Sequence, residues 1–206
     1  MDIIIALFLL IFFAPVFIVL SIAIKVFDGG PIFADMPPRL GKNKKKFYLL
    51  KFRSMTLNAH EAMLNNPIFK DLKKKWIANQ HKLPINEDVR ITPIGRIIRR
   101  TDLDELAQVF NVLKGEMSVV GPRAIFEHEM NEYIKEYPDL REAFKHYFDV
   151  KPGITGIWQV SGRNSIPIPE RIKMEAEYAK RRNILEDILI LLKTPLVVIT
   201  RKGANE

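Results

Sequence analysis

The sequence predicts a mainly helical α+β domain that follows a membrane-embedded segment at the N-terminus. Two observations predict this class. An uncharged run of 22 residues separates Asp2 from Lys25, and the more polar remainder has apolar residues largely at helical spacing, with little strand composition. A chain of 206 residues, 48% hydrophobic and 27% charged, suits one ordinary domain, or a small domain plus an appendage, and is not disordered in composition.

The composition excludes several kinds of site. The chain has no cysteine, which rules out a disulfide scaffold, a cysteine-ligated zinc site and a thiol nucleophile. It has 4 histidines and no pair with the spacing of a zinc site, so a histidine-built zinc centre is not expected. The net charge of +8 favours an anionic partner.

The uncharged run predicts a membrane segment. As a helix it would span roughly 33 Å, at ~1.5 Å per residue, and the hydrocarbon core of a bilayer is about 30 Å thick. A signal peptide would carry a basic start and a small-residue cleavage site, whereas this run follows Met1-Asp2 and ends at Lys25. Pro15 bends such a helix. Two structures stay open: a kinked helix that crosses the bilayer, and a hairpin that returns to the same face.

Basic residues follow the run closely and predict that this flank is cytoplasmic. They would also attract anionic lipid headgroups. The structural interpretation is a solvated basic loop, and both can hold. The residues are Arg39, Lys42, Lys44, Lys45 and Lys46.

The remaining elements follow from local patterns. Phe47–Phe52 is typical of a short strand bounded by charge, and Glu61–Asn79 of an amphipathic helix interrupted by Pro67. Leu83–Arg90 is expected to be a loop. Apolar spacing predicts helices over Leu103–Leu113, Ile125–Tyr137, Leu140–Phe148 and Glu170–Arg182.

Two later stretches are less regular. The glycine-rich segment Lys151–Asn164 is predicted to be an ordered loop. The strongly apolar stretch Ile184–Thr200 contains Pro195 and is flanked by charge. An interfacial helix and a core helix are both compatible with it.

Charged residues are densest between Arg90 and Arg123. Asp102 and Glu105 have the spacing of a capping box at the start of the 103–113 helix, which is a purely structural interpretation. The functional interpretation uses the same geometry: a helix start attracts phosphate, and a carboxylate held there stays ionised, which suits a nucleophile or a Mg²⁺ ligand. Three nearby arginines would neutralise a polyphosphate, since the planar guanidinium binds two oxygens at once. They are Arg96, Arg99 and Arg100.

Two further turn regions carry arginine. A Gly-Pro turn presents Arg123, and Ser161-Gly162-Arg163 ends a second glycine-rich segment. Physical reasoning alone therefore predicts a membrane-anchored protein that binds an anionic, phosphorylated ligand.

Five ordered motifs carry a more specific resemblance over nearly the whole chain. Together they resemble the bacterial sugar transferase family, the monotopic phosphoglycosyl transferases. The motifs are Lys51-Phe52-Arg53-Ser54-Met55, Thr101-Asp102-Leu103-Asp104-Glu105-Leu106, Asn111-Val112-Leu113-Lys114-Gly115-Glu116-Met117-Ser118, Gly121-Pro122-Arg123, and Lys151-Pro152-Gly153-Ile154-Thr155-Gly156 with Gln159-Val160-Ser161-Gly162-Arg163.

The resemblance implies a reaction. Family members move a sugar-1-phosphate from a UDP-sugar to a polyprenol phosphate, usually undecaprenyl phosphate, and release UMP. This step initiates the synthesis of exopolysaccharide and other bacterial glycans. The family's catalytic Asp-Glu pair falls on Asp104 and Glu105, with Asp104 as the nucleophile of a ping-pong mechanism. Both carboxylates are expected to hold Mg²⁺, and assistance with proton handling is the alternative role of Glu105. The matching phosphate-binding residues are Lys51, Arg99, Arg123 and Arg163.

The resemblance also implies an organisation. Residues 1–27 would form a re-entrant helix-break-helix in the membrane. Residues 28–206 would form a catalytic domain with interfacial amphipathic helices and a few short strands, on the cytoplasmic face of the bacterial inner membrane. The family usually has serine before the proline, where this chain has Ala14, but the missing N–H of Pro15 is expected to preserve the break.

The donor sugar and the oligomeric state are less constrained. Ile157-Trp158-Gln159-Val160 resembles members that transfer a hexose-1-phosphate more than members that transfer acetamido sugars. A homo-oligomer stays an open alternative. The non-enzymatic alternative is a basic membrane-bound adaptor for anionic lipid or acidic partners. No nucleic-acid partner is expected, because the chain lacks an interleaved aromatic and basic platform.

Overall fold

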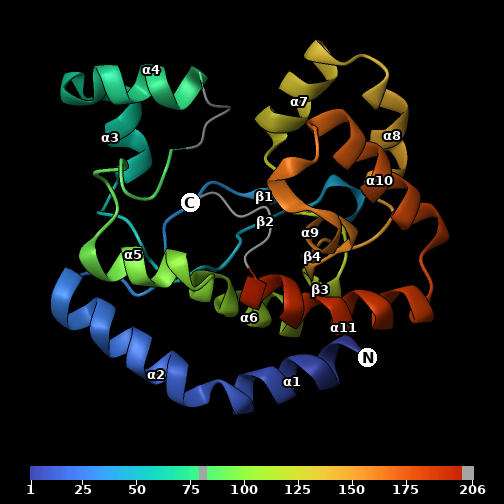
Figure 1. The fold of residues 1–206 in the computed structure, drawn as a ribbon, viewed down its shortest axis with the longest axis horizontal. Coiled ribbons are helices and arrows are strands. Elements are labelled where there is room, and N and C mark those ends of the chain that lie inside the picture. The colour runs from blue at the N-terminus through green and yellow to red at the C-terminus, as the bar shows by residue number, and fades with distance from the viewer. Residues whose placement is uncertain (79–82, 201–206) are drawn as a thin grey trace. The chain divides into compact units, whose positions relative to one another are not determined.

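The computed structural model describes residues 1–78 and 83–200 (Figure 1). This part of the chain is mainly helical with a few short strands, in agreement with the predicted α+β class. It packs as two compact units. Unit 1 contains Met1–Phe12, Met36–Leu50 and the described residues from Ala107 onward, and unit 2 contains Phe13–Asp35 and the described part of Lys51–Leu106.

The N-terminal apolar run forms two helices with a break between them. Helix α1 (Asp2–Phe12) ends before Phe13, and α2 (Ala14–Ala23) begins with Pro15 in its first turn, where the missing N–H has no helical partner to lose. A short π-helix, η1 (Ile24–Asp28), follows α2.

The length and composition of a helix decide whether it can cross a bilayer. Among the described helices, none is by itself long and apolar enough to cross a bilayer, but α1 and Ala14–Asp28 meet that requirement together, with a bend of 60°. The division into a membrane segment, 1–27, and a catalytic domain, 28–206, stays a prediction.

Unit 2 is organised around an extended segment that begins at Lys51. Within this segment Phe52 forms an isolated bridge with Phe33, and Met55 forms one with Ile91. The helices of the unit after η1 are α3 (Ala59–Asn65), η3 (Pro67–Phe69), α4 (Lys70–Ala78), α5 (Pro93–Arg100) and the start of η4 (Leu103–Gln108).

Two predictions for unit 2 are confirmed. The helix expected over 61–79 is interrupted at Pro67, as proline requires, although Asn79 itself lies outside the described residues. The stretch 83–90 has no helix or strand, as expected of a loop.

Unit 1 contains two small sheets and most of the long helices. Strands β1 (Arg39–Leu40) and β2 (Lys46–Phe47) pair antiparallel around η2 (Lys42–Lys44), and β3 (Ser118–Val120) pairs parallel with β4 (Gly153–Thr155). The helices after η4 are α6 (Val109–Leu113), α7 (Glu127–Glu136), α8 (Leu140–Tyr147), α9 (Ile157–Ser161), η5 (Arg163–Ser165), α10 (Ile168–Arg181) and α11 (Ile184–Thr200).

Helices α7, α8 and α10 bury an apolar cluster in unit 1. Figure 1 shows α8 and α10 packed side by side, and these two helices share an extensive contact. The buried members of the cluster are Leu40, Ile125, Met130, Leu140, Phe144, Tyr147, Phe148 and Ile172. The helices predicted from apolar spacing over 125–137, 140–148 and 170–182 are thereby confirmed, with small shifts at their ends.

The strand predicted over Phe47–Phe52 is wrong beyond Phe47. The Asn111 side chain takes the bonds that a neighbouring strand would make: its Oδ1 accepts from the Leu50 amide at 2.9 Å, and its Nδ2 donates to the Tyr48 carbonyl at 2.8 Å. A side chain from α6 therefore replaces the strand ladder.

The loop predicted over 151–164 is also wrong, because it contains β4 and α9. Glycine serves close packing here rather than flexibility. A Cβ on Gly153 would lie 2.1 Å from the Gly121 amide nitrogen, so only glycine lets the two backbones approach. The helix expected over 103–113 forms in two parts, a 3₁₀ turn (η4) followed by α6.

Helix α11 presents its apolar side chains to the outside. Only Asp187 and Ile190 of this helix are buried, whereas Leu185, Leu192 and Ile199 are 70%, 71% and 80% exposed. Within unit 1 the structure therefore excludes the core-helix interpretation of residues 184–200.

Candidate active site

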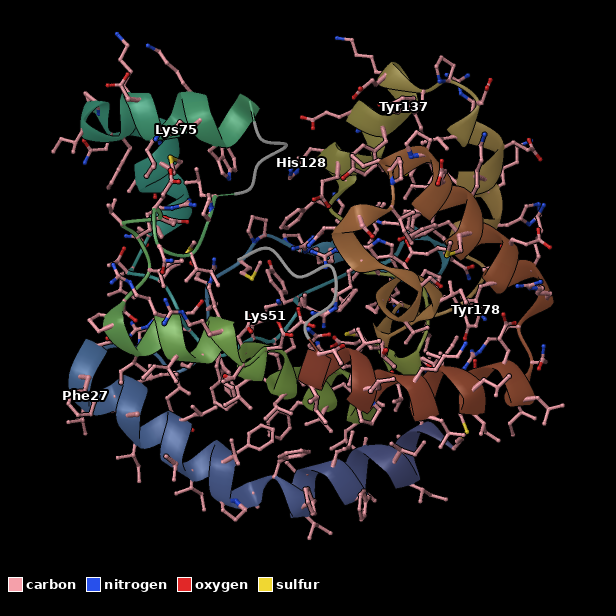
Figure 2. The ribbon with its side chains drawn as sticks, in the orientation of Figure 1. Phe27, Lys51, Lys75, His128, Tyr137 and Tyr178 are labelled. Carbon is pink, nitrogen blue, oxygen red and sulfur yellow. The ribbon has the colours of Figure 1, made fainter. Side chains whose placement is uncertain are left out.

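Lys51 joins the two carboxylates of the predicted catalytic pair. Its Nζ lies 3.2 Å from Asp104 Oδ2 and 2.7 Å from Glu105 Oε1. The Lys51 side chain, labelled in Figure 2, is 19% exposed, and those of Asp104 and Glu105 are 13% and 36% exposed. One ammonium group thus compensates two partly desolvated carboxylates that stand 53 and 54 residues away in the chain.

The backbone fixes this arrangement. The Phe52 amide donates to the Asp104 carbonyl at 3.0 Å, so the residue after Lys51 is tied to Asp104 itself. Asp102 has a left-handed backbone with φ of 54°, and its carbonyl accepts from the Glu105 amide at 3.2 Å. Asp102 directly precedes η4, in the position that the capping-box spacing predicts for the N-cap, and the side-chain bonds of that capping box stay a prediction.

Partial burial changes the acidity of the candidate nucleophile. Desolvation raises the pKa of the Asp104 carboxyl above its usual range; the Lys51 ammonium opposes the rise, and the Glu105 carboxylate adds to it. A carboxylate with a raised pKa is more basic, hence a stronger nucleophile, but it needs the neighbouring cation to stay ionised at neutral pH.

Arg99 stands at the C-terminal end of α5 in the same unit. Burial lowers the pKa of its guanidinium, while the carboxylates of Asp104 and Asp88 oppose that change. Its Nε donates to the Ser54 hydroxyl at 2.8 Å, which leaves the two terminal nitrogens of the fork to bind oxygens of a ligand.

The helix that carries Arg99 is fitted closely against Ser54. A Cβ on Gly95 would lie 1.9 Å from the Ser54 carbonyl oxygen, and that oxygen accepts from the Thr92 amide at 3.1 Å. The Thr92 hydroxyl caps α5 by accepting from the Gly95 amide and donates to Asp28 Oδ2 at 2.7 Å. Ser54 was not predicted as a site residue, although it lies in one of the motifs.

Arg123 and Arg163, the other two predicted phosphate-binding residues, belong to unit 1. Arg123 follows the Gly121-Pro122 turn, is partly exposed, and has its guanidinium carbon 5.3 Å from the centre of the Trp158 ring. Arg163 opens η5 after Gly162 and has a left-handed backbone with φ of 52°.

The pair Asp104 and Glu105 fits a magnesium ion that is shared with a phosphorylated ligand. Mg²⁺ in proteins is commonly held by one or two carboxylates, with phosphate and water oxygens completing its octahedron. In the described part of the chain no group of three or more histidine, cysteine or acidic side chains is placed to form an all-protein metal cage. Two carboxylates are the number of protein ligands that a magnesium ion shared with substrate phosphates commonly has.

Known proteins resemble this chain over its whole length. The family model described as "Bacterial sugar transferase" matches residues 1–201. A relative from Haemophilus influenzae, an "uncharacterized sugar transferase", is 42% identical over 99% of this chain and 41% of its own length. The "undecaprenyl-phosphate galactose phosphotransferase" of Salmonella typhimurium is 40% identical over 98% of this chain and 40% of its own length.

A shorter relative matches over most of its own length. The "exopolysaccharide production protein ExoY" of Sinorhizobium fredii is 34% identical over 97% of this chain and 84% of its own length. The chain spans about two fifths of the length of the Haemophilus and Salmonella relatives. The family match extends across both units and includes the segments that carry Lys51 and Asp104. The chain belongs to the bacterial sugar transferase family.

Proposed function

We propose that this chain transfers a sugar-1-phosphate from a UDP-sugar to undecaprenyl phosphate, giving a lipid-linked diphosphate sugar and UMP. The single observation that carries the proposal is the contact of Lys51 with both Asp104 and Glu105. Beside the Lys51 ammonium, Asp104 and Glu105 offer two carboxylates that can share a Mg²⁺ ion with a diphosphate, and the nearby Arg99 adds a cation for its phosphate oxygens. The names of the Salmonella and Sinorhizobium relatives support the same substrates and a role in exopolysaccharide production.

In the first step Asp104 acts as the nucleophile. One of its carboxylate oxygens attacks the β-phosphorus of the UDP-sugar, the bond from that phosphorus to the bridging oxygen breaks, and UMP leaves with the electron pair. The enzyme then carries a sugar phosphate on Asp104 as an acyl phosphate. Lys51 lowers the cost of keeping Asp104 ionised before the attack, and Arg99, held by Ser54, pairs with phosphate oxygens.

In the second step the lipid phosphate takes the sugar phosphate from the enzyme. An oxygen of undecaprenyl phosphate attacks the same phosphorus, and the bond to Asp104 breaks to restore the carboxylate. No proton has to be supplied in either step, because the attacking and departing groups are both anions. Arg123 and Arg163 would bind phosphate oxygens of the substrates.

Magnesium is the expected cofactor, with Asp104 and Glu105 as its protein ligands. When bound, it neutralises charge on the diphosphate and on the departing UMP. The residues themselves orient the reacting groups: the 3.0 Å bond between Phe52 and Asp104 fixes the backbone of the nucleophile, and Lys51 fixes its side chain.

A hexose is the expected sugar. Ile157-Trp158-Gln159-Val160 resembles hexose-1-phosphate-transferring members, and the name of the Salmonella relative specifies galactose.

The N-terminal segment and α11 are proposed to hold the protein on the cytoplasmic face of the inner membrane. The apolar side chains of α1 and α11 are largely exposed in unit 1; Ile4 and Ile11 are each 75% exposed, and Leu192 is 71% exposed. Exposed apolar area of this kind is buried when a helix lies in the headgroup region. With the break at Phe13, α1 and Ala14–Asp28 would enter and leave the membrane on the same side.

The function is tested by UMP release. The purified chain is incubated with undecaprenyl phosphate, Mg²⁺ and one of UDP-glucose, UDP-galactose or their N-acetylamino counterparts. We expect UMP and lipid-linked product with a UDP-hexose and, without the lipid, one sugar-phosphate adduct on Asp104 in the intact mass. The Asp104→Asn variant should lose at least about a thousandfold in rate and form no adduct. Turnover without any adduct on Asp104 would overturn the two-step mechanism, and no UMP with any donor would overturn the transferase assignment.

The membrane topology is tested separately by labelling. The chain has no cysteine of its own, so single cysteines placed before Asp2 and after Lys25 report without background. Both should react with a membrane-impermeant reagent from the cytoplasmic side. Labelling of the two positions from opposite sides would replace the hairpin by a spanning helix.

A further inference from the structure

A buried carboxylate in unit 1 is not used in the proposed mechanism. Glu175 lies on α10 and is 0% exposed. Burying a carboxylate is costly unless it is paired and hydrogen-bonded, so its partners indicate why it is kept. Figure 1 shows α8, α9 and α10 close together in this unit.

The partners of Glu175 converge on the backbone of Arg123. Glu175 Oε1 accepts from the Arg123 amide at 2.6 Å. The Tyr147 hydroxyl, from α8, lies 2.7 Å from the Arg123 carbonyl oxygen and 3.0 Å from Glu175 Oε2, and its one proton is shared between these two acceptors in a three-centre hydrogen bond. Both backbone polar groups of Arg123 are therefore fixed by side chains from the helical core.

Arg171 completes the cluster. Its Nε donates to Glu175 Oε2 at 3.1 Å, and its guanidinium carbon lies 4.9 Å from the centre of the Trp158 ring, the same ring that the Arg123 guanidinium contacts. Arg171 forms an ion pair with Glu175 one helical turn away. Because Arg171 neutralises this carboxylate, the Arg123 guanidinium is not needed for that purpose. The Trp158 ring at the same time limits where the Arg123 side chain can point.

The turn that carries Arg123 is also rigid on its other side. The Gly121 amide donates to the Thr155 carbonyl at 2.9 Å, and the Pro122 carbonyl accepts from the Gly153 amide at 2.9 Å. Strand β4 thus holds the residues before Arg123, while Glu175 and Tyr147 hold Arg123 itself.

We propose that Glu175 and Tyr147 are positioning residues that fix the Arg123 backbone so that its guanidinium is preorganised for a phosphate group of the nucleotide-sugar. The proposal rests on the proposed function for the identity of the ligand. The hydrogen bonds to the Arg123 amide and carbonyl support the proposal. Glu175 and Tyr147, which make these bonds, lie outside the family motifs described above. An arginine whose backbone is already fixed loses less conformational entropy when it binds a phosphate.

Tyr147→Phe tests the proposal with the least disturbance, because it removes a hydroxyl and keeps the ring in the core. Initial rates of UMP release by the full chain are measured against UDP-hexose concentration. We expect KM to rise about tenfold with kcat within about twofold of the parent. In an Arg123→Ala background the same substitution should change KM by less than about twofold, because the residue that it positions is gone.

Tyr137→Phe is the matched control, since Tyr137 packs against the same apolar cluster. Its KM should equal that of the parent. If Tyr147→Phe raises KM equally in the parent and in the Arg123→Ala background, its role is structural and the proposal fails.

A second measurement does not depend on turnover. Glu175→Gln is compared with the parent by hydrogen–deuterium exchange of the Arg123 amide, whose acceptor is altered by the change. We expect exchange at least about tenfold faster at Arg123, with little change at Met130 in the same core. Unchanged exchange overturns the positioning role even in an active enzyme, whereas faster exchange in a chain that never releases UMP upholds the positioning and overturns only the function.

Discussion

The backbone amide of Phe52 donates a hydrogen bond of 3.0 Å to the backbone carbonyl of Asp104. This bond sets Lys51 beside the carboxylates of Asp104 and Glu105. The Phe52 ring is 1% exposed and packs at 5.4 Å from the Phe17 ring and 5.7 Å from the Phe33 ring. The position of the candidate nucleophile therefore depends on how Phe52 packs in unit 2.

Phe52→Ala should destabilise unit 2 and lower activity together. Removing a buried phenylalanine side chain costs about 3–5 kcal/mol, and the cavity would loosen the segment that holds Lys51. Thermal inactivation followed by UMP release checks this: the variant should inactivate at a lower temperature and be less active before heating. Tyr48→Ala is the control, because Tyr48 is 68% exposed and its truncation should change neither quantity. The prediction would be contradicted if Phe52→Ala had the activity of the parent before heating and inactivated at the same temperature as the parent.

Lys51→Met should shift the acid limb of the pH–rate profile upward. Burial raises the pKa of Asp104 and Lys51 opposes that rise, so removing the ammonium leaves the carboxyl protonated up to a higher pH. Only the ionised carboxylate attacks phosphorus, hence kcat/KM should fall more at pH 6 than at pH 8. We expect at least about a tenfold loss at the lower pH.

Lys75→Met is the matched control for Lys51. Lys75 (labelled in Figure 2) also pairs with a carboxylate, at 3.3 Å from Glu87 Oε2, but its side chain is 68% exposed. Its profile should overlay that of the parent, because an exposed ion pair contributes little. An unshifted acid limb in Lys51→Met would show that Asp104 is not the group whose ionisation limits the rate.

Asp104→Asn should make the protein more stable at high pH while abolishing turnover. A carboxyl whose pKa is raised on folding binds its proton more tightly in the folded state, so stability falls as pH rises from the ordinary pKa of aspartate through the raised one. Asparagine does not ionise, so the variant does not lose this stability as pH rises. The difference in Tm between variant and parent should therefore grow from pH 4 to pH 8.

Asp71→Asn serves as the comparison, since the Asp71 side chain is 93% exposed and pairs only loosely with Lys74 at 3.4 Å. Its Tm should follow the parent at every pH. A Tm difference for Asp104→Asn that shrinks toward pH 8 would mean that the carboxylate is stabilised on folding rather than penalised.

Ser54→Ala should weaken substrate binding through Arg99. The Ser54 hydroxyl accepts from Arg99 Nε at 2.8 Å and is the contact that orients the guanidinium fork. Its loss should raise KM for the nucleotide-sugar about tenfold with little change in kcat. In an Arg99→Ala background Ser54→Ala should have no further effect on KM. Equal effects in both backgrounds would assign Ser54 a structural role only.

Local patterns explain the parts of the fold that were predicted. Apolar spacing over 125–137, 140–148 and 170–182 requires one buried face, and the chain satisfies it with α7, α8 and α10 around a common cluster. The break at Phe13 follows from Pro15, whose effect on the backbone is confined to its own helix. The loop prediction for 151–164 was wrong because the positions of glycines in a sequence do not show whether a glycine forms a turn or allows two backbones to approach closely.

The sequence by itself determined the helix-break-helix, the helical core and the membership of Lys51, Asp104 and Glu105 in one set of motifs, because each depends on residues that are near in the chain or on recognisable patterns. Only the tertiary structure decided that Asn111 replaces a strand, that Ser54 orients Arg99 and that Glu175 holds the backbone of Arg123. These bonds join residues 45 to 61 positions apart, and no local periodicity encodes which distant polar groups satisfy one another when they are buried.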